Sequence, residues 1–531
     1  MKALRLVWAL VCVSLLGAGL VEAKPFRWSS KGDLQCTDPH AANEGLTNAI
    51  NRHVYERLVG RDKKLLPIPE LALSWQQTAP TVWVFKLRPG VKFHDGAPFT
   101  ADDVIFSIER AQNLPSTFRA SALPIGKGRK IDDLTVEFTT PEVNPVMISL
   151  VSSIGIMNKA WSQKNKVEKA QNLAGKEESF AARNANGTGP YVLVSREPDV
   201  KTVFRRNPNW WGLAEKMMEG NVDEFTYLPI KSDATRLAAL STGEVDFVLD
   251  PPLQNLEQMK RNPALKVVEG PEDRIIFLCM DQARDELQYS NVKGKNPFKD
   301  KRVRQAMYQA IDVEAIRTQV MRGLAKPAAN IFPNPAGAGV PPEMQKRRPF
   351  DLAAAKKLMA EAGYAAGFEV TLDCPNNRYV NDEKICVAVS AMLAKIGINV
   401  KVNAIPRSLW NPKGVNRDSS FIMLGWGGIS GDADAFHTLL PVWHGPDAKG
   451  SGQYNWGGIK DPKLDALIDA QAGEADATKR QQIILEAVKL HDDNIYHLPL
   501  HLQFIPWASR ANVTFSHRSD NYLIVPWVTV K

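Results

Sequence analysis

A strand, a helix and a second strand follow one another between residues 368 and 405. Residues 368–373 and 398–405 alternate apolar with polar side chains, and the segment from about 382 to 395 has the apolar spacing of a helix. Strands that are joined by one helix run parallel, with a right-handed crossover. We therefore predict an α/β protein with mixed sheets.

Other segments fit this class. Residues 81–88, TVWVFKLR, alternate and then meet Pro and Gly, which predicts a half-buried strand entering a hairpin. Thr100 stands three residues before Asp103 at the start of an apolar pattern, which indicates a helix with a capping box. A helix over 234–241 and a strand over 245–249 follow in the same way.

The first 23 residues have the layout of a cleaved secretory signal. Lys2 and Arg5 precede an apolar run over residues 6–20, and Val-Glu-Ala follows. The alternative is an N-terminal helix of the fold. Cys12 lies inside the apolar run, so it does not indicate a lipoprotein. We expect a soluble protein that is exported to the periplasm.

The chain without its leader, residues 24–531, is larger than one hydrophobic core supports, so we expect two or three domains. It keeps 64 basic and 57 acidic side chains, and the densest basic run is only residues 346–348. Interspersed charge and an export signal argue against a nucleic-acid partner. No Gly/Ser linker separates the domains, which are therefore predicted to interleave.

Four cysteines remain after export. Cys374 and Cys386 flank a polar loop between a predicted strand and helix, so we expect a local disulfide there, since oxidising compartments favour such bonds. Cys36 and Cys279 would then form the remaining pair. The alternative is four buried, unpaired cysteines.

The sequence offers little support for an enzyme or a metal site. It lacks the HExxH, GxSxG and GxxxxGK patterns. His497 and His501 would share one face of a strand, and Asp432 with Asp434 stands near His437, but both sets are sparse for a metal site. We predict no catalytic residue, no metal ligand and no cofactor.

Five segments together resemble one family. Residues 82–110, VWVFKLRPGVKFHDGAPFTADDVIFSIER, are similar to the signature of the family 5 extracellular solute-binding proteins, the receptors of dipeptide, oligopeptide and nickel ABC importers. The later segments occur in the family's order, and they are residues 187–212, 239–248, 297–312 and 454–469. The likeness covers nearly the whole mature chain.

The resemblance implies a bilobal periplasmic-binding-protein fold, type II, of the large class with an extra inserted domain and a two-segment hinge. The predicted parts are a signal peptide 1–23; lobe I from 24–68, 188–277 and 503–531; an inserted domain 69–187; and lobe II 278–502.

The resemblance also assigns a cleft loop, LGWGGISGDADAF, at residues 424–436. It implies that Trp426 packs on the solute, and that Gly427 and Gly428 let the backbone approach it as an added strand. The alternative for Trp426 is an ordinary core position.

One position departs from the peptide-binding pattern. Those relatives carry an Asp that pairs with the ligand's ammonium, and this chain has Ile429 there. Either the solute lacks a free amine in that pocket, or Asp432 or Glu44 replaces the missing acid.

Four further residues complete the predicted site. Glu44 matches a cleft segment of lobe I in oligopeptide binders, and Arg417 matches another basic position of those proteins. Arg378, beside Tyr379, falls in the loop where dipeptide binders hold the ligand carboxylate, at an offset that is not identical. Guanidinium groups suit carboxylates because two parallel bonds fix the orientation, although each Arg could equally lie at the surface.

We predict a monomeric receptor of an ABC importer that captures a small solute, a peptide or peptide-like compound, and delivers it to the permease subunits. The alternatives are a nickel or metal-chelate binder of the same family and an exported hydrolase.

Overall fold

The computed structural model describes the chain except for residues 1–23, 176, 337, 428–437 and 448–450. The predicted leader therefore lies outside the described residues. So do Gly428, Ile429 and Asp432 of the predicted cleft loop.

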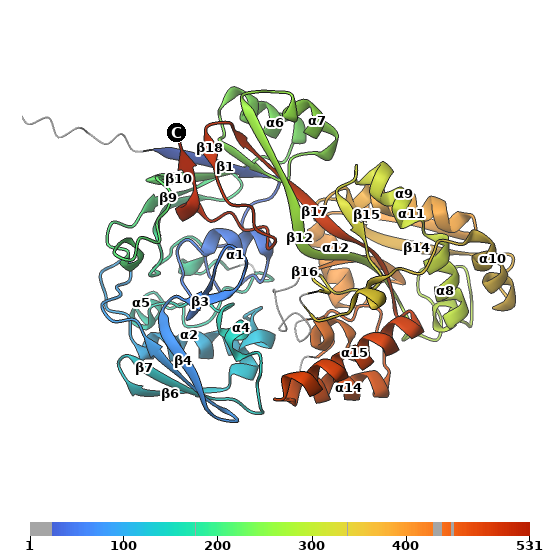
Figure 1. Ribbon diagram of the computed structural model, residues 1–531, viewed down its shortest axis with the longest axis horizontal. Coiled ribbons are helices and arrows are strands. Elements are labelled where there is room, and N and C mark those ends of the chain that lie inside the picture. Colours follow the sequence, from blue (N-terminus) through green and yellow to red (C-terminus); the bar gives the residue numbers. More distant parts are fainter. Residues whose placement is uncertain (1–23, 176, 337, 428–437, 448–450) are drawn as a thin grey trace, which may run out of the picture.

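A large mixed sheet runs through the described chain and joins its two halves (Figure 1). Its neighbouring strands, in spatial order, are β15 (Ile398–Ile405), β14 (Phe368–Pro375), β16 (Phe421–Gly427), β12 (Leu265–Met280), β17 (His497–Arg510), β11 (Phe247–Leu249), β1 (Pro25–Ser30), β10 (Glu224–Pro229), β9 (Lys201–Arg206) and β8 (Tyr191–Glu197), with β13 (Ala325–Pro327) beside β17. The sheet contains both parallel and antiparallel pairs, so the predicted mixed α/β class is confirmed.

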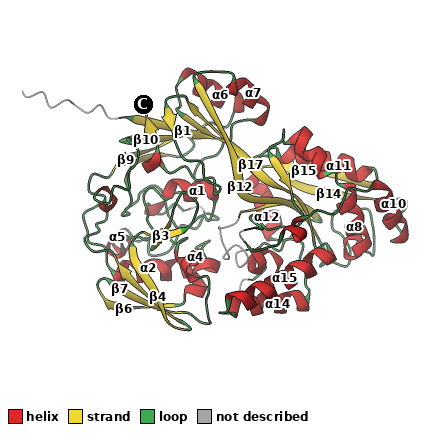
Figure 2. Ribbon diagram, viewed as in Figure 1, coloured by secondary structure: helices red, strands yellow, loops and turns green. Residues whose placement is uncertain are grey.

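Two long antiparallel strands, β12 and β17, pass from one half of the molecule to the other (Figure 2). Their register shifts between Pro271 and Ile275 and again between Ile276 and Phe277. Such irregularities bend a ladder and free side chains from it. The two predicted boundaries between lobe I and lobe II, after residues 277 and 502, would fall within these two strands.

The β15 half buries most of its apolar side chains beneath helices that flank the sheet (Figure 1). These helices are α8 (Lys301–Ala310), α9 (Val313–Ala315), α10 (Leu352–Glu361), α11 (Asp382–Ala394), α12 (Arg407–Val415), α14 (Pro462–Gly473) and α15 (Ala477–Asn494). The predicted strand, helix, strand unit corresponds to β14, α11 and β15, and the two strands pair in parallel.

A separate antiparallel sheet forms the lower part of the other half. Its order is β4 (Ala72–Ala79), β5 (Val82–Leu87), β7 (Thr135–Thr139) and β6 (Lys127–Asp132). Helix α2 (Ala101–Gln112) packs on it, and Thr100 is its N-cap residue, as predicted. The Asp103 carboxylate accepts the Thr100 backbone N–H at 2.9 Å, while the Thr100 hydroxyl donates to the same carboxylate rather than capping the helix backbone.

The remaining elements are short. They are α1 (Gly45–Asn51), α3 (Arg119–Ala122), α4 (Met147–Val151), α5 (Lys159–Lys164), α6 (Asp233–Thr242), α7 (Leu256–Lys260), β2 (Val59–Arg61), β3 (Pro67–Pro69), β18 (Val513–Thr514) and β19 (Thr529–Val530). The predicted helix over 234–241 is α6, and Gly243 ends it with a φ of 85°. Among the described residues, no helix is long and apolar enough to span a bilayer.

The disulfide prediction is right for one pair and wrong for the other. Cys374 and Cys386 are bonded, 12 residues apart. Cys36 and Cys279 are both free and buried. Cys279 lies on β12 within the core of the β15 half, whereas Cys36 packs in a small separate cluster with Ala182, so their sulfur atoms cannot meet. Burial raises the pKa of the Cys36 thiol to about 12, which keeps it protonated.

Candidate binding cleft

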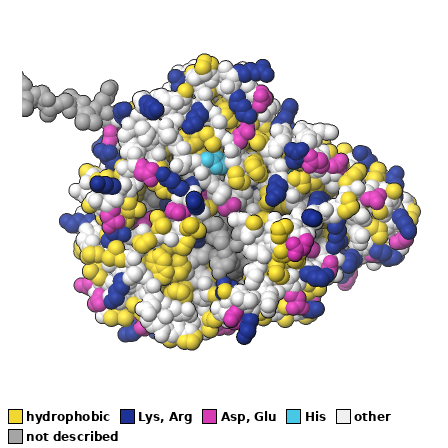
Figure 3. Space-filling model, viewed as in Figure 1, with side chains coloured by type: hydrophobic (Ala, Val, Ile, Leu, Met, Phe, Trp, Pro, Cys, Tyr) yellow, Lys and Arg dark blue, Asp and Glu magenta, His cyan; other side chains and the backbone are white. Residues whose placement is uncertain are grey.

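A cavity of about 980 Å³ lies where the two halves face each other. The face shown in Figure 3 is hollowed between them. Residues from widely separated segments line the cavity: the α1 region, the segment around residues 117–124, β12, the end of β16 and the C-terminal residues 519–522. A volume near 1,000 Å³ is at the upper end of the range for small-molecule sites.

Glu44 precedes α1 and lines the cavity. Its carboxylate accepts the backbone N–H of Thr47 at 3.0 Å, which caps the helix, and lies 3.3 Å from the Arg407 guanidinium on α12. Burial would raise the pKa of Glu44, but Arg407 and Arg378 outweigh that effect and lower it. Glu44 is therefore an ionised link between the two walls.

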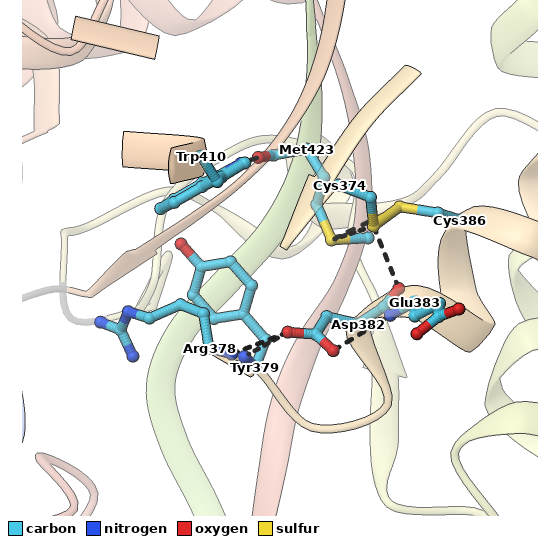
Figure 4. Close-up of a disulfide and its surroundings, with 8 residues drawn as sticks. All are labelled: Cys374, Arg378, Tyr379, Asp382, Glu383, Cys386, Trp410 and Met423. Atoms are coloured by element: carbon cyan, nitrogen blue, oxygen red, sulfur yellow. Dashed lines mark hydrogen bonds between the residues drawn. A yellow bond between two sulfur atoms is a disulfide. The ribbon is translucent and has the colours of Figure 1, made fainter. Parts of the chain in front are cut away.

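The loop after β14 presents Arg378 and Tyr379 (Figure 4). The Asp382 carboxylate accepts both of their backbone N–H groups, at 2.8 and 3.0 Å, and the Cys374–Cys386 disulfide joins β14 to α11 beside it. The Arg378 side chain points away from the disulfide in Figure 4. Strand, disulfide and carboxylate together fix the loop so that both side chains line the cavity.

Three arginines meet here, and two of them have carboxylate partners. Arg274 lies 2.8 Å from Glu272, and Arg407 is paired with Glu44. Arg378 has no ion pair with any described residue. Burial lowers the pKa of Arg378, and the nearby charge of Arg274 adds to that effect. Among the residues that the structure describes, the cluster thus has three guanidinium groups and two carboxylate ion pairs, which suits an anionic group of a solute.

A bulge in the sheet supplies the Arg274 pair. Glu272, Asp273 and Arg274 fall between the paired residues Pro271 and Ile275, so they leave the β12–β17 ladder and line the cavity. The Glu272 carboxylate also accepts Gln503 Nε2–H from β17. The bulge therefore aims charged side chains from the crossing strands into the cavity.

Aromatic rings form the wall beside β16. Trp426 lies 4.9 Å from the Tyr454 ring, and Trp410 lies 4.9 Å from the Trp456 ring, measured between centroids. The Trp426 indole N–H is buried without a hydrogen-bond partner among the described residues. A buried donor without a partner is costly, so this group is available to an acceptor on a solute.

Gly425 is needed for this wall. The Tyr379 hydroxyl donates to the Gly425 carbonyl at 3.1 Å. A Cβ at Gly425 would lie 2.5 Å from the Tyr379 ring, which is closer than real side chains approach. Gly427 is less restricted, because a Cβ there would meet the Arg274 guanidinium at an ordinary 3.4 Å.

The structure brings together Trp426, Gly427, Glu44, Arg378 and Tyr379 around one cavity. Arg417 is not among the lining residues. Its guanidinium donates to the carbonyls of Asn455 and Gly452, so its position favours a structural role over the predicted ligand contact.

Sequence reasoning missed several lining residues. Arg274 and Arg407 carry no local signal, because an arginine on a strand or helix looks the same whether it faces a cavity or solvent. Tyr454 and Trp456 lie in one of the segments on which the family resemblance was based, and their aromatic spacing could have indicated them.

No group of three metal-ligating side chains occurs among the described residues. His497 and His501 are both buried on β17. His497 Nδ1 and His491 Nε2 lie 2.8 Å apart and share one hydrogen bond. Burial lowers the pKa of both His491 and His497, so these rings are neutral packing groups.

The two halves, the paired crossing strands and the lined cavity between them define a two-lobed binding protein. The family model for the middle region of the bacterial extracellular solute-binding proteins, family 5, matches residues 67–443. The chain therefore belongs to this family. The chain is therefore a solute-binding receptor of the kind that serves ABC importers.

Relatives agree with this assignment. The chain is 28% identical over 463 residues to the glutathione-binding protein GsiB of Pectobacterium atrosepticum, covering 85% of this chain and 83% of that one. It is 27% identical over 509 residues to the dipeptide-binding protein of Escherichia coli, covering 90% of each. The dipeptide-binding protein of a Pseudoalteromonas species, in complex with Met-Leu, has the same fold, with a TM-score of 0.81 at 22% identity over 96% of this chain and 100% of that one.

Proposed function

We propose that this receptor captures a peptide or peptide-like solute with a free carboxylate, which Arg378 binds. The observation that carries the proposal is the guanidinium of Arg378, which has no ion pair among the described residues, in a cavity where Arg274 and Arg407 already have partners. An anion there would complete the charge balance of the cluster, and a bidentate guanidinium contact would orient it.

The strand edge next to Arg378 supports an extended solute. β16 pairs with β12 on one side, and with β14 only at Phe421 and Ile422 on the other. The Met423 carbonyl accepts Trp410 Nε1–H, so a side chain occupies part of that open edge. Gly427 is the last described residue of the edge, and an extended backbone could pair beyond it.

The same proposal includes the protein's localisation and partners. The leader over residues 1–23 would direct the chain to the periplasm, where it would act as a monomer and deliver its solute to membrane permease subunits. Among the described residues that line the cavity, arginines, carboxylates and aromatic rings can bind a solute, and no histidine or cysteine is present to form a catalytic pair. We therefore propose a receptor without catalytic activity.

Calorimetry with Ala-Ala-Ala and its C-terminal amide tests the proposal. The free acid should bind wild-type protein about tenfold or more tightly than the amide, because a charge-assisted hydrogen bond contributes about 1.5 to 3 kcal/mol. In Arg378→Gln the two peptides should bind alike.

Arg205→Gln is the matched control. It removes the same charge from an exposed position on β9 outside the cavity, so it should keep the preference for the acid. Equal binding of acid and amide to wild-type protein would refute the carboxylate assignment.

A further inference from the structure

A second group of arginines lines the same cavity at the other end of α1. Arg52 follows the last residue of that helix, and Arg57 and Arg61 come next in the chain as it enters β2. All three line the cavity. Neither the family assignment nor the proposed carboxylate contact at Arg378 uses them.

Two of these guanidinium groups have binding capacity left. Arg57 is only 5% exposed, and its Nε–H has no hydrogen-bond partner among the described residues, while its Nη1 donates to the Tyr55 carbonyl. Arg52 makes no side-chain hydrogen bond or ion pair with a described residue. Arg61 is already engaged by carbonyl and hydroxyl oxygens, so it contributes charge rather than a free donor.

The acids nearby offset the positive charge of this group only in part. Asp520 is paired with Arg518 through both carboxylate oxygens. Glu70 accepts the backbone N–H of Arg57, and its charge partly opposes the lowering of the Arg57 pKa. Burial, with the charge of Glu70, raises the pKa of Glu56 to about 8, so Glu56 is mostly neutral at pH 7.

The arginines also repel one another. Burial lowers the pKa of Arg57 to about 9 and that of Arg61 to about 10, and in both cases the charge of Arg52 adds to the effect. A bound anion would relieve both the repulsion and the unpaired donor on Arg57.

The two cationic regions are separated by the length of α1. Arg378 acts on Glu44 at the start of the helix, and Arg52 stands at its end. Eight residue steps at 1.5 Å per residue place the backbones of Glu44 and Arg52 roughly 12 Å apart. In an extended tripeptide, two residue steps cover about 7 Å, and a glutamate side chain at the first residue adds roughly 4 to 5 Å.

We propose that Arg52 and Arg57 form a second anion subsite, so that the preferred solute is a peptide-like compound with two anionic groups, one for each end of α1. One carboxylate binds Arg378, and the other binds Arg52 and Arg57. This inference rests on the proposed function for the first carboxylate, and its own test is the second.

Calorimetry with Glu-Ala-Ala and Gln-Ala-Ala isolates the second group, because the two peptides differ only in one side-chain charge. Wild-type protein should bind the glutamate peptide about tenfold more tightly. Arg52→Gln should lower the ratio toward one, because only Arg57 then remains to bind the side-chain carboxylate. Arg378→Gln should weaken both peptides and keep the ratio.

Arg205→Gln again controls for net charge and should leave the ratio unchanged. Arg52 is the position to change, since it is half-buried, whereas loss of the buried Arg57 could unfold the protein. If both peptides bind wild-type protein equally, or if Arg52→Gln leaves the ratio unaltered, the second subsite is wrong while the receptor function stands.

A measurement without peptides separates the two proposals. In protein labelled with ¹⁵N-arginine, inorganic phosphate should shift the Nε–H resonance of Arg57, identified by its loss in Arg57→Lys. Arg52→Gln should suppress the shift, and Arg205→Gln should not. A phosphate shift without peptide binding would overturn the proposed function and support the subsite, whereas the absence of a shift would count against the subsite.

Discussion

At the scale of single residues, the carboxyl group of Asp250, directly after β11, has a perturbed pKa. Burial raises its pKa to about 6, and the nearby charge of Glu272 adds to that rise. The folded protein therefore holds a proton that the unfolded chain loses between about pH 4 and pH 6. Since the folded state binds more protons in that window, this group makes stability fall as the pH rises through it.

Replacement of the Asp250 carboxyl by an amide should remove this loss of stability at high pH. We expect Asp250→Asn to be more stable than wild type by about 1 to 2 kcal/mol at pH 8 and nearly equal at pH 4, because Asn stays neutral at both. Asn also tolerates the left-handed backbone at this position, where φ is 54°. Urea unfolding at the two pH values measures the difference.

Asp199→Asn is the control for this comparison. Asp199 has a similar φ of 59° but an exposed side chain. It should show no comparable gain at pH 8. If Asp250→Asn gave the same gain at pH 4 as at pH 8, the cause would not be the buried charge.

At the scale of elements, the loop between β14 and α11 depends on its disulfide. Replacing Cys374 and Cys386 together by Ser should cost about 3 kcal/mol, because the bond restricts the unfolded chain over the 12 residues of separation. The freed loop should also hold Arg378 less firmly and weaken binding of a carboxylate peptide. Urea unfolding and calorimetry measure the two effects.

A reductant provides the internal control. Dithiothreitol should destabilise the wild type by a similar amount and leave the double variant unchanged. Cys279→Ala removes a buried thiol without removing the cross-link, so it should keep the response to reductant. A wild type that ignores full reduction would contradict the prediction.

The elements that the sequence predicts well are those with local signals. The unit β14, α11, β15 follows from apolar spacing, and its observed limits differ little from the predicted ones. The bond at Cys374 follows from short sequence separation. The Cys36–Cys279 pair was obtained by elimination, which assumes that every exported cysteine is bonded, and the two residues lie in different cores.

Long-range parts of the site could not be predicted in this way. Helix α12 carries Pro412 in its interior, which a sequence argument treats as a helix breaker. Arg407 and Trp410 on that helix reach the cavity only because α12 lies against β14 and β16. A single sequence does not say which elements become neighbours. It therefore predicts the loop position of Arg378 but not its proximity to Arg274 and Arg407.

At the scale of the whole molecule, the contacts across the cavity differ in kind from those within each half. The halves are continuous through β12 and β17, whose register shifts next to the cavity. The Glu44–Arg407 pair joins α1 of one half to α12 of the other at 3.3 Å. A contact of this type forms only when the walls are close, so it should favour the closed arrangement over an open one.

The last prediction follows from that pair. Arg407→Gln should shift the solute-free protein toward the open arrangement, because a partly exposed ion pair contributes up to about 1 kcal/mol, and Glu44 would then lose its partner. Small-angle scattering should show a larger radius of gyration than for wild type without solute, and a larger compaction on adding saturating Ala-Ala-Ala. Apparent affinity should fall about fivefold, since part of the binding free energy is then used to close the cleft.

Arg302→Gln removes the same charge from a pair with Asp300 inside one half, so its scattering and affinity should match wild type. Identical profiles for Arg407→Gln and wild type would show that this pair does not govern the closing of the two halves.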